Sequence, residues 1–226
     1  MKKYDIALFD LDGTLSESGE GILDCVRMIF RDMNRPLPDE SSLAAFIGPP
    51  MYDSLRRCGF DHEDAQKGVA IYKSHFISHG IYKNKVYDGI PELLRKLRDN
   101  GVRLGVASTK YQKFTDRIIG MLGLTEYFDI VGGCNAVNGE AEGGGSLRST
   151  KIDVMNYVID NMKKSDAEKA VMIGDTKYDA EGACAVGCDF IGCRFGYGSE
   201  EEMISNYPCG APVFVDSPAE IAGYII

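Results

Sequence analysis

The segment Tyr4-Asp5-Ile6-Ala7-Leu8-Phe9-Asp10-Leu11-Asp12-Gly13-Thr14-Leu15 decides the fold. Its first half is a short apolar run that stops at polar residues, which is typical of a buried strand. Two carboxylates, Asp10 and Asp12, follow this strand, and Gly13 allows the chain to turn sharply there. The segment therefore predicts a buried strand that ends in a pair of acidic side chains.

From about residue 88 onward, segments with helical and strand periodicity alternate along the chain. The expected helices cover residues 91–100, 113–122, 151–162, 178–186 and 218–224. The expected strands cover residues 102–107, 128–131, 170–173, 190–193 and 213–215. Such alternation implies right-handed crossovers and a parallel sheet. We therefore expect an α/β protein with a Rossmann-like parallel sheet.

The stretch from about 19 to 80 shows only helical patterns, interrupted where Gly48-Pro49-Pro50 must break a helix. Two domains follow from this change of pattern. Residues 1–15 and 89–226 are expected to form the α/β core, and residues 16–88 an inserted all-helical domain. Within the core, the glycine-rich residues 138–146 are expected to form a flexible loop.

Composition excludes several classes of protein. The 226 residues are 44% hydrophobic and 26% charged, as in ordinary globular proteins. No apolar stretch approaches the roughly 20 residues that cross a bilayer, and no secretory signal peptide is recognisable. The net charge of -9 disfavours binding to a nucleic-acid polymer, although it permits small phosphorylated ligands. Seven cysteines without a Cys-x-x-Cys pair favour a reducing, cytoplasmic location.

A second apolar strand, residues 170–173, leads into Gly-Asp, with a further aspartate four residues later. On one helical turn Asp175 and Asp179 can approach the same point. Ligands of parallel sheets bind beyond the carboxyl ends of the strands, where Asp10 and Asp12 are also expected. Clustered carboxylates of this kind suit Mg²⁺. Each Asp could instead cap a turn or the next helix.

Two further positions could hold an anion. Ser108-Thr109-Lys110 follows the strand expected at 102–107, and hydroxyls there could hold a phosphoryl oxygen or cap the next helix. Lys151 begins an expected helix, where a cation does not complement the helix dipole. This unfavourable position indicates that the Lys151 side chain binds an anion. The alternative is that Lys151 is a solvated surface residue.

The ordered set Asp10-x-Asp12-Gly13-Thr14-Leu15, Ser108, Lys151 and Gly174-Asp175-x-x-x-Asp179 resembles the haloacid dehalogenase superfamily of phosphohydrolases. The resemblance covers nearly the whole chain, and the helical insert is similar to the cap domain of that family. Phe46-Ile47-Gly48-Pro49-Pro50 and Tyr87-Asp88-Gly89-Ile90 resemble the phosphoglycolate-phosphatase and 5'-nucleotidase-like group.

The resemblance implies a role for each motif. Asp10 would be the nucleophile that forms an aspartyl-phosphate, and Asp12 the general acid and then the general base. Ser108, Thr109 and Lys151 would bind the phosphoryl group, with Lys151 also steadying Asp10. The Mg²⁺ ligands would be Asp10, Asp12 through its main-chain carbonyl, Asp175 and Asp179.

The chain also departs from the family pattern. Tyr111 and Ile152 stand where relatives often have proline after the lysines of the second and third motifs. The glycine-rich stretch before Lys151 is longer than usual, so Arg148 is an alternative source of the third-motif cation.

The expected function is Mg²⁺-dependent hydrolysis of a small phosphomonoester, either phosphoglycolate-like or nucleoside monophosphate-like. A sugar-phosphate phosphomutase similar to β-phosphoglucomutase would share every catalytic residue and is the alternative. A non-catalytic binding module is a further alternative. A dehalogenase is disfavoured because the resemblance implies that such enzymes lack the second acid, here Asp12, and need no metal. The protein is expected to be a monomer or a small homo-oligomer, without nucleic-acid or membrane partners.

Overall fold

The computed structural model describes residues 2–137, 140–142, 145–165 and 167–226. The chain divides into two compact units, one made of Met1–Ser16 with Val86–Ile226 and the other of Glu17–Lys85. Four residues of the predicted glycine-rich loop, Asn138, Gly139, Gly143 and Gly144, lie outside the described part.

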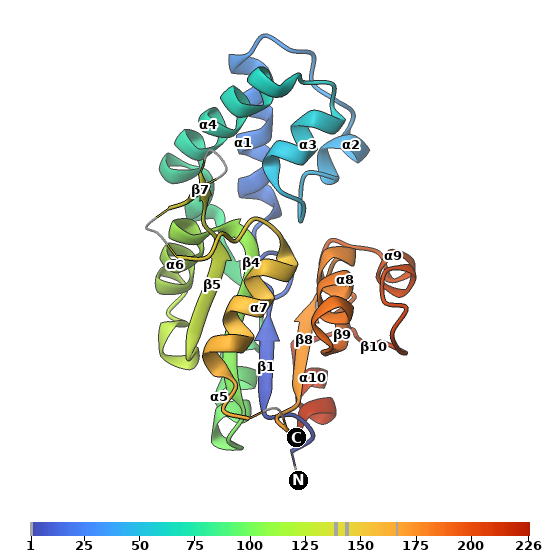
Figure 1. Ribbon diagram of the computed structural model, residues 1–226. Coiled ribbons are helices and arrows are strands. Elements are labelled where there is room, and N and C mark those ends of the chain that lie inside the picture. The colour runs from blue at the N-terminus through green and yellow to red at the C-terminus, as the bar shows by residue number, and fades with distance from the viewer. Residues whose placement is uncertain (1, 138–139, 143–144, 166) are drawn as a thin grey trace. The chain divides into compact units, whose positions relative to one another are not determined.

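A six-stranded parallel sheet forms the centre of the first unit, in the order β10-β9-β8-β1-β4-β5 (Figure 1). The strands are β1 (Ile6–Phe9), β4 (Arg103–Tyr111), β5 (Ile130–Cys134), β8 (Ala170–Gly174), β9 (Asp189–Cys193) and β10 (Val213–Val215). β1 lies between β4 and β8, so the segment that ends in Asp10 occupies an interior position. The predicted α/β fold with a parallel sheet is confirmed.

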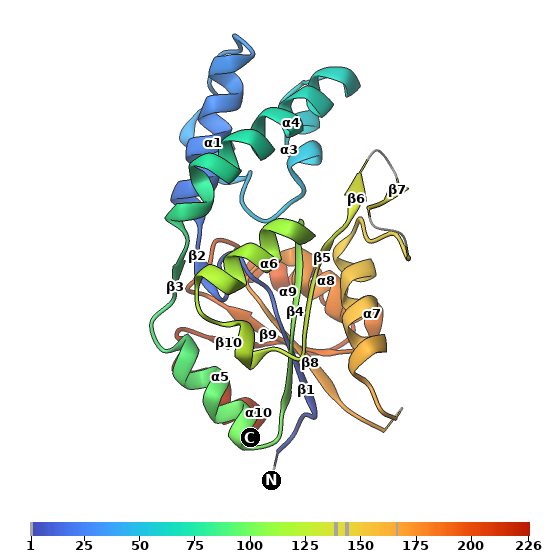
Figure 2. The ribbon, with the colours of Figure 1, turned by 90° about the vertical axis from the view of Figure 1, so that its left-hand side faces the viewer.

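Helices cover both faces of this sheet, and every residue of β1 is therefore buried. Ile6 and Leu8 pack in one apolar cluster with side chains of α7 (Lys151–Met162) and α8 (Lys177–Val186). α5 (Ile90–Asp99) and α10 (Pro218–Ile225) pack against each other on the opposite side of the sheet from α7 (Figure 2). The interior strand that leads to Asp10 is therefore covered on both faces.

The end of β4 differs from the prediction. The strand expected to stop at Ala107 continues to Tyr111, so Ser108, Thr109 and Lys110 lie within β4 rather than after it. Its pairing with β5 shifts register between Ala107 and Tyr111 and resumes at Cys134. An irregularity of this kind leaves no trace in hydrophobic periodicity, which is why the prediction of the strand end was wrong.

Several short elements complete the first unit. α6 (Gln112–Met121), η2 (Thr125–Tyr127) and α9 (Glu200–Ser205) are helical, and α9 was not predicted. β6 (Ala136–Val137), just before the stretch expected to be a loop, pairs in antiparallel fashion with β7 (Glu140–Ala141) inside it. Glu142, directly after β7, accepts hydrogen bonds from Tyr111 and Lys113.

The second unit consists of α1 (Gly19–Asp32), α2 (Glu40–Ala44), α3 (Met51–Arg57), α4 (His62–Ser78) and η1 (Gly80–Lys83). Phe30 packs edge-on against Phe46 and Phe60. Gly21 approaches η1 so closely that a Cβ there would meet the Gly80 carbonyl oxygen at 2.3 Å. At the two crossings between the units, β2 (Ser16–Glu17) pairs with β3 (Lys85–Val86). Across the described residues, each helix is too short or too polar to cross a membrane.

Candidate active site

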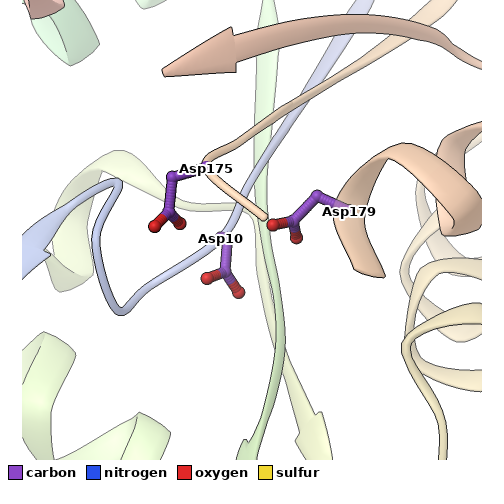
Figure 3. A group of neighbouring side chains, drawn as sticks. All are labelled: Asp10, Asp175 and Asp179. Carbon is purple, nitrogen blue, oxygen red and sulfur yellow. The ribbon is translucent and has the colours of Figure 1, made fainter. Parts of the chain in front are cut away.

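Three buried aspartates meet beyond the carboxyl ends of two neighbouring strands. Asp10 follows β1, Asp175 follows β8, and Asp179 lies in the first turn of α8. One oxygen from each carboxylate lies within 4.8 Å of the other two (Figure 3). This edge of a parallel sheet is where ligands bind in α/β proteins.

Asp175 is fixed by groups from two loops. Its Oδ1 accepts a hydrogen bond from Thr14 Oγ1 at 3.2 Å, and its Oδ2 accepts one from the Tyr197 amide at 2.8 Å. A Cβ at Gly13 would lie 2.2 Å from Asp175 Oδ2, and one at Gly196 would lie 2.2 Å from Asp175 Cβ. Gly13 also has a φ of 86°, which favours glycine. Both positions therefore require glycine for Asp175 to stay in place.

Asp179 owes its position to the start of α8. Its Oδ2 accepts hydrogen bonds from the backbone amide and the hydroxyl of Thr176, at 2.9 and 2.8 Å. Bonds from the N-cap residue to the side chain of the third helical residue are part of a capping box, which fixes the first turn of a helix. The other oxygen, Oδ1, lies 2.5 Å from Lys151 Nζ.

Lys151 joins two of the three carboxylates. It is the first residue of α7, where Thr150 and Asp153 form a second capping box. Its Nζ donates to Asp10 Oδ1 at 2.6 Å as well as contacting Asp179. Burial alone would lower the pKa of Lys151, but the charges of Asp10 and Asp179 outweigh burial and raise it. Lys151 is therefore a buried, charged counter-ion of the acidic cluster.

Arg148, the alternative source of the third-motif cation, contacts groups outside the acidic cluster. Its Nε donates to the Gly133 carbonyl at 3.0 Å, and its guanidinium lies 4.0 Å from the centre of the Tyr157 ring. The structure brings Lys151 to Asp10 and places Arg148 beside β5 and α7.

The acidic cluster carries more negative charge than its own cation compensates. Burial raises the pKa of Asp10 to about 7, although the charge of Lys151 opposes this, and Asp179 adds to it. Burial also raises the pKa of Asp175 well above its usual range, and Asp179 and Asp10 reinforce the effect. When all three carboxylates are ionised, Lys151 leaves two negative charges uncompensated, which one divalent cation would neutralise. The all-oxygen donor set suits Mg²⁺.

The remaining predicted residues lie in β4 and in the segment that follows β1. Ser108 is buried and Thr109 is half-buried in the irregular part of β4. The side chain of Asp12 is outside the group of three and forms an ion pair with Lys110, at 2.6 Å from Oδ2 to Nζ.

Sequence reasoning quoted Thr14 in the first motif without giving it a role, and it missed the loop at Gly196 and Tyr197. A signal for that loop was present, since Phe195-Gly196-Tyr197-Gly198 comes shortly after the expected strand at 190–193. Its glycines at the carboxyl end of another strand could have indicated close approach to the site.

The chain is similar to known phosphate-handling proteins. A family model described as haloacid dehalogenase-like hydrolase matches residues 7–193. The 5'-nucleotidase of Pseudomonas aeruginosa is 35% identical over 207 residues, which are 91% of this chain and 90% of the relative. The tyrosine-protein kinase PtkA of Mycobacterium tuberculosis is 34% identical over 193 residues, or 85% of this chain. The chain spans only 63% of that kinase. A predicted phosphatase from Clostridium acetobutylicum, a crystal structure, superimposes with a TM-score of 0.83 at 36% identity, covering 97% of each chain.

Proposed function

The chain belongs to the haloacid dehalogenase-like hydrolases, and on that basis we propose that it is a Mg²⁺-dependent phosphatase acting on a small phosphomonoester. The observation that carries the proposal is the buried group of Asp10, Asp175 and Asp179 with Lys151 between two of its members. Buried carboxylates with an incomplete counter-charge favour a cation and an anionic substrate at the same place.

Asp10 is the nucleophile in this proposal. Lys151 holds Asp10 Oδ1, which fixes the carboxylate and leaves Oδ2 to attack phosphorus. The bond between Asp10 and phosphorus forms as the ester P–O bond breaks, and water then cleaves the aspartyl-phosphate. Asp12 gives a proton to the leaving oxygen and takes one back from the attacking water.

The phosphoryl group needs positioning and positive charge rather than covalent help. Ser108, Thr109 and Lys151 would hold its oxygens. Mg²⁺, held by Asp10, Asp175, Asp179 and the main-chain carbonyl of Asp12, would offset the charge that the substrate brings to this acidic site. In the ligand-free state Lys151 performs part of that neutralisation.

The substrate is proposed to be phosphoglycolate-like or nucleoside monophosphate-like, because relatives are named a phosphoglycolate phosphatase and a 5'-nucleotidase. The helical unit, Glu17–Lys85, is proposed as the cap that selects the substrate and excludes water during the reaction. The cysteine pattern makes the cytoplasm the proposed compartment.

The test is phosphate release from a panel of phosphomonoesters, with and without Mg²⁺. The panel would contain nucleoside monophosphates, phosphoglycolate, sugar phosphates and an aryl phosphate. The wild type and Asp160→Asn, an exposed position on α7, should release phosphate, whereas Asp10→Asn should not. Mg²⁺-independent release, or full activity of Asp10→Asn, would contradict the proposal. Isomerisation of a sugar phosphate without phosphate release would favour the mutase.

A further inference from the structure

Lys110 and Asp12 form a second buried ion pair beside the acidic cluster. Nζ of Lys110 lies 2.6 Å from Oδ2 of Asp12, and their side chains are only 8% and 12% exposed. Lys113, three residues further on, pairs with Glu142 at the surface, where the side chains are 67% and 36% exposed. Exposed pairs contribute little, whereas a charge withdrawn from water depends strongly on its partner. Lys110 is therefore the counter-charge of Asp12, as Lys151 is for Asp10.

The irregular end of β4 is what places Lys110 there. Regular pairing with β5 stops after Ala107 and resumes at Tyr111, and an irregularity of this kind redirects side chains. Within it, the backbone amide of Lys110 donates to Ser108 Oγ at 3.3 Å. The segment that carries the predicted phosphoryl-binding hydroxyls thus also fixes the lysine that reaches Asp12.

The two carboxylate oxygens of Asp12 differ in their surroundings. Oδ2 accepts the hydrogen bond from Lys110, whereas Oδ1 is buried and has no hydrogen-bond partner among the described residues. A buried carboxylate oxygen without a partner is costly, and such atoms are rare outside functional sites. Asp12 also lies close enough to Asp10 for the two charges to repel. The unpartnered oxygen is therefore an acceptor available to a ligand atom beside the nucleophile.

We propose that Lys110 is a positioning residue that holds Asp12 by Oδ2 and thereby makes Oδ1 the atom that exchanges the proton. This inference rests on the proposed phosphatase function. In the first step the ester P–O bond breaks, the bond from Asp10 to phosphorus forms, and the proton on Asp12 Oδ1 moves to the leaving oxygen. In the second step water bonds to phosphorus, the bond to Asp10 breaks, and the proton from water returns to Oδ1. The ester and one water become an alcohol and phosphate.

A different role for Lys110 would be direct binding of the phosphoryl group. The two roles predict different sensitivity to the leaving group. An alkyl alcohol needs a proton in order to leave, whereas p-nitrophenolate departs readily without one. Loss of a residue that positions the proton donor should therefore slow alkyl esters selectively. Loss of a phosphoryl ligand should slow both kinds of ester alike, because both carry the same phosphoryl group.

The experiment compares Lys110→Met, Lys110→Arg and the surface control Lys113→Met. For each variant, kcat and KM are measured with Mg²⁺ on p-nitrophenyl phosphate and on an alkyl phosphomonoester that the wild type hydrolyses. Since a positioned general acid contributes about 100-fold or more, Lys110→Met should lower kcat for the alkyl ester by about 100-fold. Its kcat for the aryl ester and both KM values should change little. Lys110→Arg should recover part of the loss, and Lys113→Met should match the wild type.

A double-mutant comparison decides whether Lys110 acts through Asp12. In an Asp12→Asn background, Lys110→Met should cause no further loss on the alkyl ester, because the group it positions is already absent. Equal losses on both esters, or a full additional loss in that background, would overturn the inference. Thermal unfolding shows whether each variant folds, and if Lys110→Met does not, Lys110→Gln takes its place. A wild type inactive on every ester would instead contradict the proposed function.

Discussion

Replacing Lys151 by methionine tests the electrostatic basis of the site. Methionine is also a long, unbranched side chain, but it removes the ammonium that contacts Asp10 at 2.6 Å and Asp179 at 2.5 Å. The three carboxylates would then share a buried site without any cation from the chain. We expect the metal-free variant to be markedly less stable than the wild type.

The magnitude follows from the burial of the pair. Removing one partner of a buried ion pair costs about 3–5 kcal/mol. In a protein of this size each kcal/mol lowers Tm by roughly 2–4 °C, so the metal-free variant should melt about 6–20 °C below the wild type. Protonation limits this loss, because burial already raises the pKa of Asp10 to about 7. Removing Lys151 raises this pKa further, so above about pH 7 the folded variant binds more protons than the folded wild type, and the loss should grow as the pH rises beyond about 7.

The assay is calorimetric unfolding at about pH 8, above the pKa of about 7 to which burial raises Asp10, first with a chelator and then with saturating Mg²⁺. Mg²⁺ should stabilise Lys151→Met more than the wild type, since the cation meets three uncompensated charges instead of two. Lys163→Met, an exposed change just after α7, is the matched control and should resemble the wild type. A metal-free Lys151→Met that unfolds within about 1 kcal/mol of the wild type would refute this reasoning. An unchanged Mg²⁺ effect would refute it as well.

Three further predictions follow from the same geometry. In the wild type, stabilisation by Mg²⁺ should increase from about pH 5 to about pH 8, because Asp10 and Asp175 must lose protons to bind the cation. Calorimetry that shows the same stabilisation at both pH values would contradict this. Gly196→Ala should weaken Mg²⁺ binding in titration calorimetry, because its Cβ would lie 2.2 Å from Asp175 Cβ, whereas Gly223→Ala, with no atom within 4 Å, should bind normally. Thr150→Ala should lower the free energy of unfolding in urea by about 1 kcal/mol and also reduce kcat, because it removes the cap of α7; unchanged values would show that the cap is dispensable.

The elements that carry the acidic cluster were predictable because their signals are local. Each apolar run that precedes Asp10 or Asp175 is a short strand with a polar stop, and alternation with helices requires a parallel sheet. Parallel strands bring their carboxyl ends to one edge, which is sufficient to place both aspartates together. The capping pattern at Thr176 and Asp179 is likewise local, because the residues that determine where a helix begins lie within four positions of one another.

The remaining features depend on contacts between distant segments. The pairing of Lys110 with Asp12 spans 98 positions and requires the register shift in β4, which periodicity does not encode. The amide of Tyr197 reaches Asp175 from a loop 22 residues away, and only the folded chain shows that Gly196 must lack a side chain. Tertiary packing determines these details, so the sequence predicted the acidic cluster better than the groups that hold it in place.

The most direct test of the account is to trap and locate the covalent intermediate. The protein would be mixed with a radiolabelled phosphomonoester and Mg²⁺, quenched rapidly in acid and digested, and the labelled peptide would be identified. The account predicts label on Asp10, in the peptide that follows β1, dependent on Mg²⁺ and absent from Asp10→Asn. Label on another residue, or turnover by Asp10→Asn at the wild-type rate, would contradict the assignment of Asp10 as the nucleophile.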